Sequence, residues 1–345
     1  MQKNNIKIVW NGTSLGQETN EGYKNAEDNI VSRLMLSGFD VYQTCLSQFA
    51  YVECDVLINN RLPMDYQVSS GYNIGFSYWE TTALPPLWVE KMNMMDEIWT
   101  TSVWAKDIFI NSGVTVPVYS FKLGIDPEYF SPVLRQRKNQ FVFGSIGSPS
   151  SRKNSQMVVD AFLKLFGDND NVKLLYKTMG PPDARINNKT INVKSLYEDE
   201  RFIVVDNDLG LKDFAKLYDE IDCLVYPTRG EGFGLIPFQA IAKGIPTICT
   251  NETACTEYAH LSVPLDSELT DNAMFGIYEN CGYWAEPNFN DLCDKMLYVY
   301  NNYDVVANNT YNNVLSVYDE MSWDYAAEGY ENRLCQVLNE LTAKL

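Results

Sequence analysis

The sequence has only one histidine, His260, and its eight cysteines form no Cys-Xaa-Xaa-Cys pair. A single histidine gives little support to hydrolysis by a histidine-activated nucleophile, so we interpret His260 as a structural residue. Cys223 and Cys249 lie in apolar runs and are expected to be small buried side chains. Scattered cysteines of this kind favour a reduced, cytoplasmic protein over a disulfide framework.

The sequence also lacks long apolar runs and has few basic residues. No run approaches the roughly 20 apolar residues of a membrane span, and the first residues lead into a strand without a secretory signal. The 27 Lys and Arg face 45 Asp and Glu, which gives a net charge of −18. This balance argues against a broad nucleic-acid surface but leaves room for a small basic groove. The length of 345 residues and the apolar content of 46% suffice for two domains with cores.

Residues 226–250 are the most informative stretch, and their pattern predicts strand, loop, short helix and strand. We expect Pro237 at the start of this helix and Gly244 at its end. The loop contains three glycines within five residues: Gly230, Gly232 and Gly234. Such a loop suits a ligand that approaches the backbone closely, and the free N–H groups at the helix start suit a phosphate. Glu231 and Gln239 flank this cradle and are expected to face the polar part of the same ligand.

The turn at 148–154 follows an apolar strand and carries the adjacent cations Arg152 and Lys153. In a parallel sheet the carboxyl ends of the strands share one edge, so this pair is expected to face the glycine cradle. There it would neutralise charge on a departing diphosphate. Gly147 opens the turn, and Lys177, at the end of the next strand, is a weaker third cation.

Several motifs carry a resemblance to a known family. Residues 231–246, Glu-Gly-Phe-Gly-Leu-Ile-Pro-Phe-Gln-Ala-Ile-Ala-Lys-Gly-Ile-Pro, resemble the donor-site signature of retaining nucleotide-sugar glycosyltransferases with the GT-B fold. Gly-Ser-Pro-Ser-Ser-Arg-Lys-Asn at 147–154 is similar to the family's diphosphate motif, and Asp-Glu-Ile-Trp-Thr-Thr-Ser at 96–102 is similar to its acceptor domain. The resemblance covers most of residues 74–335 and is strongest over 141–250.

The resemblance implies an α/β protein with two Rossmann-like domains that face each other across a cleft. Residues 1–130 would form the acceptor-binding domain and residues 131–320 the domain that binds the nucleotide sugar. A C-terminal helix at 321–345 would cross back and pack on both.

The resemblance also implies roles for individual residues. Arg152 and Lys153 would act on the diphosphate and Glu231 on the sugar, as the candidate catalytic residues. The remaining donor-binding candidates are Gly147, Lys177, Gly232, Phe233, Gly234, Leu235 and Gln239. The family signature has two glutamates eight positions apart, and the second accepts hydrogen bonds from ribose hydroxyls. Gln239 replaces that glutamate, so it can still accept through its amide oxygen but brings no charge.

Candidate acceptor-side residues lie in the first domain. Gly12 and Thr13 follow the first predicted strand, where ligands bind in such sheets, although the segment also fits an ordinary connector. Trp79 and Glu80 are placed at the end of a predicted strand at 73–81. The alternative is that Trp79 belongs to the core and Glu80 caps the next helix.

Asp206 and Asp208 follow an apolar strand and match the metal-binding Asp-Xaa-Asp of the other major glycosyltransferase fold, GT-A. The elements after them match the GT-B order, and Arg152 and Lys153 would duplicate the metal's task. We therefore interpret Asp206 and Asp208 as loop and helix-cap residues and expect no obligatory metal or other cofactor.

The predicted function is transfer of a hexose-type sugar from a UDP or GDP sugar to a hydroxyl acceptor, with retention of configuration. The acceptor is open: a glycan, a lipid-linked sugar, a protein or a modified nucleobase. One alternative is a binding or regulatory module that has lost turnover, which the Gln239 substitution keeps open. Another is a glycosyltransferase of hydroxymethylated DNA bases, which would need a basic groove.

Overall fold

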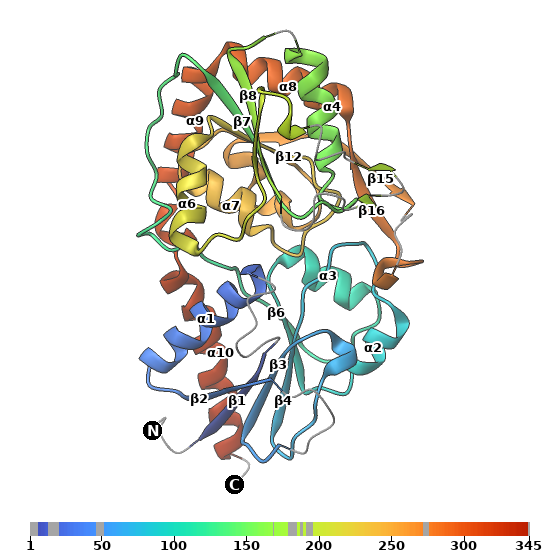
Figure 1. Ribbon diagram of the computed structural model, residues 1–345. Helices are drawn as coiled ribbons and strands as arrows, with labels where there is room; N and C mark the ends of the chain where they lie inside the picture. Colours follow the sequence, from blue (N-terminus) through green and yellow to red (C-terminus); the bar gives the residue numbers. More distant parts are fainter. Residues whose placement is uncertain are drawn as a thin grey trace. The chain divides into compact units, whose positions relative to one another are not determined.

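The computed structural model describes residues 6–12, 21–45, 52–167, 169–178, 185–186, 189–190, 196–271 and 276–343. The chain divides into two compact units. Unit 1 comprises Met1–Gly124, Asn280–Gly282 and Asp319–Leu345, and unit 2 comprises Ile125–Glu279 and Tyr283–Tyr318. Each unit contains a six-stranded sheet with helices on both faces (Figure 1). Across the described ranges, no helix combines the length and apolar character that crossing a membrane would require.

The sheet of unit 1 has the strand order β2-β1-β3-β4-β5-β6, and every pair is parallel. Its strands are β1 (Lys7–Asn11), β2 (Asp40–Thr44), β3 (Val56–Asn60), β4 (Tyr72–Phe76), β5 (Glu97–Thr100) and β6 (Val118–Ser120). Helix α1 (Glu21–Leu36) packs beside α10 (Trp323–Ala343). Helices α2 (Pro86–Met92) and α3 (Val103–Asn111) lie on the opposite face (Figure 1). Strand β2 lies on one side of β1, and β3 to β6 follow on its other side. Because crossovers between parallel strands are right-handed, these two directions place helices on opposite faces of the sheet.

The sheet of unit 2 has the strand order β11-β8-β7-β12-β13-β14 and is also parallel. Its strands are β7 (Phe141–Ile146), β8 (Val172–Lys177), β11 (Phe202–Val205), β12 (Cys223–Tyr226), β13 (Thr247–Thr250) and β14 (Val263–Leu265). Its helices are α4 (Ser155–Phe166), α6 (Leu211–Glu220), α7 (Leu235–Ala242), α8 (Phe289–Asn301) and α9 (Tyr303–Leu315). Helix α4 packs on α8, and α9 contacts both α7 and α8. An antiparallel hairpin, β15 (Ser267–Asp271) and β16 (Tyr283–Pro287), extends from this unit (Figure 1).

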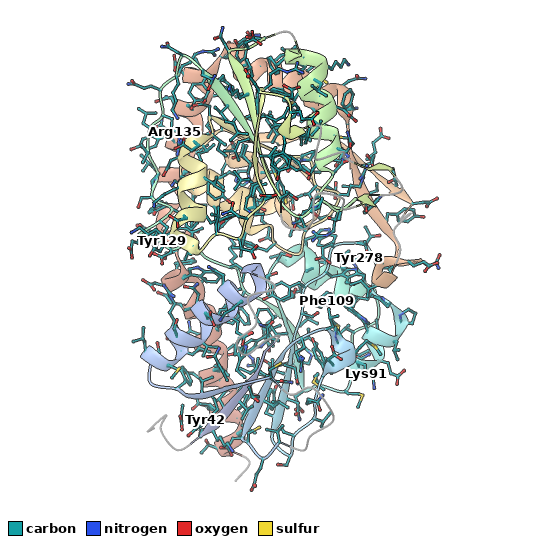
Figure 2. All side chains as sticks on the ribbon, in the orientation of Figure 1. Tyr42, Lys91, Phe109, Tyr129, Arg135 and Tyr278 are labelled. Atoms are coloured by element: carbon teal, nitrogen blue, oxygen red, sulfur yellow. The ribbon has the colours of Figure 1, made fainter. Side chains whose placement is uncertain are left out.

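Apolar strands fix the cores of both units. Every residue of β3 and of β12 is buried, as expected for central parallel strands that are covered on both faces. In unit 1, Phe109 on α3, labelled in Figure 2, is fully buried. In unit 2, aromatic side chains from β7 and α4 form much of the core, with Phe143 and Phe166 at a ring-centroid distance of 5.3 Å. The cores hold the strands in register and so fix where each strand ends.

The structure corrects some predicted element boundaries. Strand β4 ends at Phe76, so Trp79 and Glu80 lie in the connection beyond it. Helix α7 begins at Leu235, which makes Pro237 its third residue. Gly244 follows the helix with a φ of 74°, a left-handed conformation that suits glycine after a helix, as predicted.

A buried ion pair joins α10 to the sheet of unit 1. Arg333 Nη2 lies 2.6 Å from Glu97 Oε2, and the Arg333 guanidinium stacks 4.6 Å from the centre of the Tyr119 ring. Tyr72 Oη and Trp99 Nε1 donate hydrogen bonds of 2.9 and 2.6 Å to the Glu97 carboxylate. Glu97 and Tyr72 are the first residues of β5 and β4, so this network lies at the amino edge of the sheet.

Candidate functional site

The candidate site lies at the carboxyl edge of the sheet in unit 2. Strands β7 and β12 are neighbours in the sheet. From β7 the chain continues to β8 on one side, and from β12 it continues to β13 on the other side. Crevices at such topological switch points are where open α/β sheets bind ligands. The turn at 147–154 follows β7, and the loop at 227–234 follows β12. The two segments selected from the sequence therefore meet at this point.

Hydrogen bonds to main-chain carbonyl oxygens hold the turn and the loop together. Arg229 N donates to the carbonyl oxygen of Arg152 at 2.7 Å, and Arg229 Nη1 donates to that of Ser151 at 2.5 Å. In the other direction, Arg152 Nη1 donates to the carbonyl oxygen of Gly230 at 2.6 Å. Arg152, Lys153 and the glycine loop thus lie on the same edge of the sheet.

Glu231 is the centre of a buried polar network. Its side chain is almost fully covered, and its two oxygens contact both predicted cations. Lys153 Nζ lies 2.7 Å from Oε1, and Arg152 Nη1 lies 3.1 Å from Oε2. Thr228 Oγ1 and Tyr226 Oη also donate to Oε1, at 2.8 and 3.0 Å. The sequence analysis did not identify Thr228 and Tyr226, whose only sequence signal is a polar group at the end of an apolar strand.

The electrostatics of this network favour a bound anion. Burial alone would raise the pKa of Glu231, but Lys153 and Arg152 outweigh it and lower the pKa to about 2. The carboxyl group is therefore ionised near neutral pH. The three side chains together carry a formal charge of +1, in a chain whose net charge is −18. Arginine and lysine side chains in such a group are suited to a polyanion such as a diphosphate.

Unusual backbone angles shape the turn that carries the cations. Gly147 has a φ of 152° and Asn154 a φ of 55°, and Asn154 immediately precedes α4. Gly147 N donates to the carbonyl oxygen of Lys177 at 3.0 Å, so the turn is fixed to the end of β8. Lys177 is only 3% exposed, and its Nζ donates to the carbonyl oxygen of Thr178 at 2.8 Å. Its ammonium group is thus buried beside the turn.

The start of α7 presents backbone N–H groups. Among the described residues, the N–H groups of Phe233, Gly234 and Leu235 have no hydrogen-bond acceptor. The Phe233 side chain is buried against Phe238, at a ring-centroid distance of 5.0 Å. Tyr258 Oη lies 2.7 and 2.8 Å from the carbonyl oxygens of Phe233 and Gly234 and donates to them. These contacts fix the carbonyl groups of the loop and so restrain the orientation of its N–H groups.

Replacing Gly234 by alanine is expected to lower the free energy of unfolding by roughly 2–4 kcal/mol. Gly234 has a φ of 87°, and an added Cβ would lie 2.3 Å from Tyr258 Oη. Gly210→Ala is the matched control, because no atom lies within 4 Å of the position of its Cβ. Urea unfolding of the two variants measures the difference, and equal stabilities would contradict this account of the loop.

Gln239 contacts a residue that the sequence analysis did not identify. Its side chain lies in the second turn of α7 and is buried. Gln239 Oε1 accepts a hydrogen bond of 3.0 Å from Tyr218 Oη, a fully buried hydroxyl on α6. The amide oxygen that could accept from a ribose hydroxyl is therefore held in place by Tyr218, with a second lone pair remaining.

Of the predicted acceptor-side residues, Gly12 follows directly after β1. An added Cβ on Gly12 would lie 1.9 Å from Glu27 Oε1, so a larger residue at this position would require the Glu27 side chain to move. Glu27 Oε2 also accepts a hydrogen bond of 3.3 Å from Asn60 Nδ2. Thr13 lies outside the described residues.

Trp79 is a core residue, which is the alternative raised from the sequence. Its side chain is 0% exposed, its Nε1 donates to the carbonyl oxygen of Ala83 at 2.9 Å, and its ring packs 4.7 Å from that of Trp88. Glu80 is also buried, but the residue that precedes α2 is Pro85, so Glu80 does not cap this helix. A fully covered side chain touches no ligand in this conformation, and we do not carry Trp79 forward.

The Asp206 and Asp208 pair lies in the connection between β11 and α6, as predicted, but the expected cap is wrong. The residue that caps α6 is Gly210, which offers no side chain for a hydrogen bond. Asp206 instead accepts a short hydrogen bond from Tyr197 Oη. Within the described ranges, no group of three or more His, Cys, Asp and Glu side chains is arranged to hold a metal ion.

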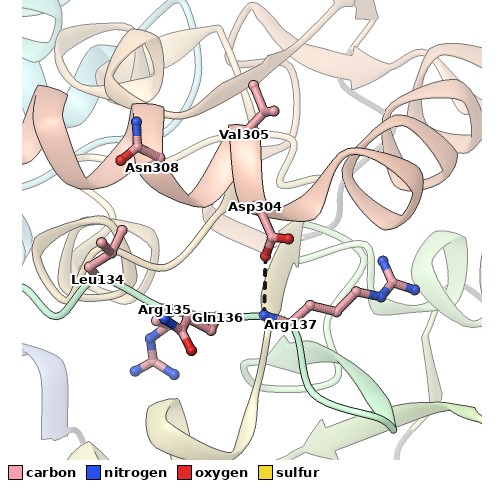
Figure 3. A pocket seen from close by; sticks show the side chains of 7 residues that line it. All are labelled: Leu134, Arg135, Gln136, Arg137, Asp304, Val305 and Asn308. Atoms are coloured by element: carbon pink, nitrogen blue, oxygen red, sulfur yellow. Dashed lines mark hydrogen bonds between the residues drawn. The ribbon is translucent and has the colours of Figure 1, made fainter.

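A separate pocket of about 640 Å³ lies near the opposite edge of the unit 2 sheet (Figure 3). It is lined by Leu134, Arg135, Gln136, Arg137, Asp304, Val305 and Asn308. Arg137 N donates to Asp304 Oδ1 at 3.2 Å, which ties the segment before β7 to α9 (Figure 3). None of the residues predicted from the sequence to bind a ligand lines this pocket.

A family model matches the part of the chain that contains both segments of the candidate site. Residues 138–275 match the family model described as Glycosyl transferases group 1. The matched range contains both the turn at 147–154 and the loop at 227–234. It covers the part of the chain in which the resemblance to this family is strongest.

One curated relative is a protein of Sulfolobus islandicus filamentous virus (isolate Iceland/Hveragerdi) that bears the provisional name glycosyltransferase 45. It is 23% identical to this chain over 238 residues, which are 66% of this chain and 63% of the viral protein. This chain therefore spans less than two thirds of the length of that relative.

Solved structures similar to this chain include glycosyltransferases of the GT-B fold. Sucrose-phosphate synthase from Thermosynechococcus elongatus has a TM-score of 0.69 at 12% identity, over 99% of this chain and all of that protein. Anabaena HepE, in complex with UDP-glucose, has a TM-score of 0.65 at 14% identity, over 98% of this chain and all of that protein. S. aureus TarM has a TM-score of 0.57 at 14% identity, and this chain spans 54% of it. The predicted α/β fold class, GT-B with two Rossmann-like domains, is thus confirmed.

Proposed function

We propose that this chain transfers a hexose-type sugar from a nucleotide diphosphate sugar, with UDP or GDP as the nucleotide, to a hydroxyl acceptor. The observation that carries the proposal is the convergence of Arg152, Lys153 and the N–H groups at the start of α7 at one edge of the unit 2 sheet. Cations and helix-start amides together suit a diphosphate. The buried Glu231 carboxylate beside them would accept hydrogen bonds from sugar hydroxyls.

The proposed chemistry is stabilisation of a leaving group. Negative charge develops on the diphosphate as its bond to the sugar carbon breaks, and Lys153 and Arg152 would offset that charge. The departing phosphate oxygen would take the acceptor's proton on the same face of the sugar. That step retains the configuration and requires no side-chain base, which fits a chain with a single histidine. Gln239 would accept a hydrogen bond from the ribose.

The preference for a nucleotide is best tested first with a UDP sugar. Anabaena HepE, which shares the fold over its full length, was solved in complex with UDP-glucose. The decisive assay is release of UDP from UDP-glucose in the absence of an acceptor, because slow hydrolysis needs no knowledge of the acceptor. We expect slow release of UDP that depends on the enzyme. Binding of UDP-, GDP- and ADP-sugars with no hydrolysis of any would instead favour a binding or regulatory module.

Removal of metal ions is expected to leave this hydrolysis within about twofold of its original rate, because Arg152 and Lys153 supply the positive charge. The rate is measured after dialysis against EDTA, and again after addition of Mn²⁺ or Mg²⁺. A rate that is lost with EDTA and restored by Mn²⁺ would contradict a metal-independent mechanism.

A further inference from the structure

One carboxylate, that of Glu231, contacts both candidate cations. Arg152 and Lys153 contact different oxygens of Glu231, at 3.1 and 2.7 Å. The Arg152, Lys153 and Glu231 side chains are 19%, 13% and 7% exposed, respectively, so solvent screens these contacts only weakly. A diphosphate that binds here must therefore compete with Glu231 for the same positive charges.

Two further side chains would keep one oxygen of Glu231, Oε1, hydrogen-bonded when Glu231 releases the cations. Thr228 Oγ1 and Tyr226 Oη donate to Glu231 Oε1 and come from the same strand end and loop as Glu231. The Glu231 N–H group, in turn, donates to Thr253 Oγ1 at 3.1 Å, which fixes the backbone at this point. An ionised carboxylate in a buried site is costly unless donors satisfy it. Thr228 and Tyr226 are placed to do so when the cations turn to a ligand.

From these contacts we infer that Glu231 is an internal competitor of the diphosphate. It holds Arg152 and Lys153 in the ligand-free protein, and a bound diphosphate takes them over while Thr228 and Tyr226 retain the carboxylate. The inference rests on the proposed donor site and adds to it a competition between Glu231 and the diphosphate for the same two cations. Positive charge would be neutralised until a diphosphate arrives, which limits binding of weaker anions such as single phosphates.

The test is the affinity of the intact chain for inorganic pyrophosphate, measured by isothermal titration calorimetry in the presence of EDTA. Glu231→Gln keeps the shape of the side chain and an acceptor oxygen but removes the competing charge. It is expected to tighten pyrophosphate binding on the order of tenfold. Asp213→Asn, which removes one negative charge from an exposed pair with Lys216, is the control and is expected to leave the affinity unchanged. Weaker or unchanged binding by Glu231→Gln would overturn the inference, because Glu231 would then organise the cations.

Thr228→Val provides a second variant with the opposite expected sign. It removes a donor on which Glu231 depends most when the cations have turned away, so pyrophosphate binding is expected to weaken several-fold. Thr228→Ser is expected to restore it.

Failure of the proposed function is a separate outcome. In that case the wild-type chain would bind pyrophosphate and Glu231→Gln would bind it more tightly, but UDP-glucose would not be hydrolysed. Absence of pyrophosphate binding by both wild type and Glu231→Gln would overturn the inference itself.

Discussion

Replacement of Lys153 by alanine is expected to slow the release of UDP from UDP-glucose by about 10²–10³-fold. The Lys153 side chain is 13% exposed, its Nζ lies 2.7 and 2.6 Å from Glu231 Oε1 and Tyr226 Oη, and its turn is joined to the glycine loop. A positive charge in such a covered position stabilises a leaving group more than an exposed charge would. The expected loss is mainly in kcat, because charge on the leaving oxygen is greatest in the transition state.

Lys216→Ala is the matched control for this prediction. Lys216 belongs to the same unit, but its side chain is 63% exposed and pairs with Asp213 on the surface. We expect its rate to equal that of the wild type. Circular dichroism must show that Lys153→Ala is folded, which is expected because Arg152, Thr228 and Tyr226 still satisfy Glu231. A folded Lys153→Ala variant with an unchanged rate would remove Lys153 from the site.

The largest expected effect on stability lies in unit 1. Replacement of Arg333 by leucine is expected to lower the free energy of unfolding of unit 1 by roughly 3–5 kcal/mol, because it leaves the Glu97 carboxylate buried without its cation. Glu97 is 0% exposed, and Arg333 donates three hydrogen bonds to it, at 2.6, 3.0 and 3.2 Å. Urea unfolding, together with hydrogen exchange of the β5 amides, measures the loss.

Two further variants separate this buried pair from an ordinary surface pair. Arg33→Ala breaks a contact with Asp324, whose side chain is 82% exposed, and is expected to cost no more than about 1 kcal/mol. The double variant Glu97→Leu with Arg333→Leu removes both buried charges and is expected to regain much of the stability lost by Arg333→Leu. Equal losses for Arg33→Ala and Arg333→Leu would show that the buried network does not hold α10.

Much of the order of strands and helices could be predicted, because most of the parallel strands are short apolar runs. Strand β12 is one example, since all of its residues are buried. The meeting of residues 152–153 with the loop at 227–234 was also predictable, because carboxyl ends of parallel strands share an edge. Strand β15 could not be predicted, because Ser267–Asp271 is largely exposed and has little apolar pattern.

The polar partners of the site could not be predicted for a different reason. The hydrogen bond between Tyr218 and Gln239 joins two helices, and nothing in the local pattern of either helix indicates it. The pair of Glu97 and Arg333 joins residues 236 positions apart. For Trp79 the sequence left core and ligand contact open, and only packing against Trp88 decides between them. Contacts of this kind depend on the packing of complete elements.

The most direct test of the account is a crystal structure of the chain with UDP. The account predicts that the β-phosphate lies within hydrogen-bond distance of Lys153 and Arg152, and of N–H groups from residues 233–235. It would be contradicted by UDP bound elsewhere, for example in the pocket formed by Leu134–Arg137 and α9, with the turn after β7 unoccupied.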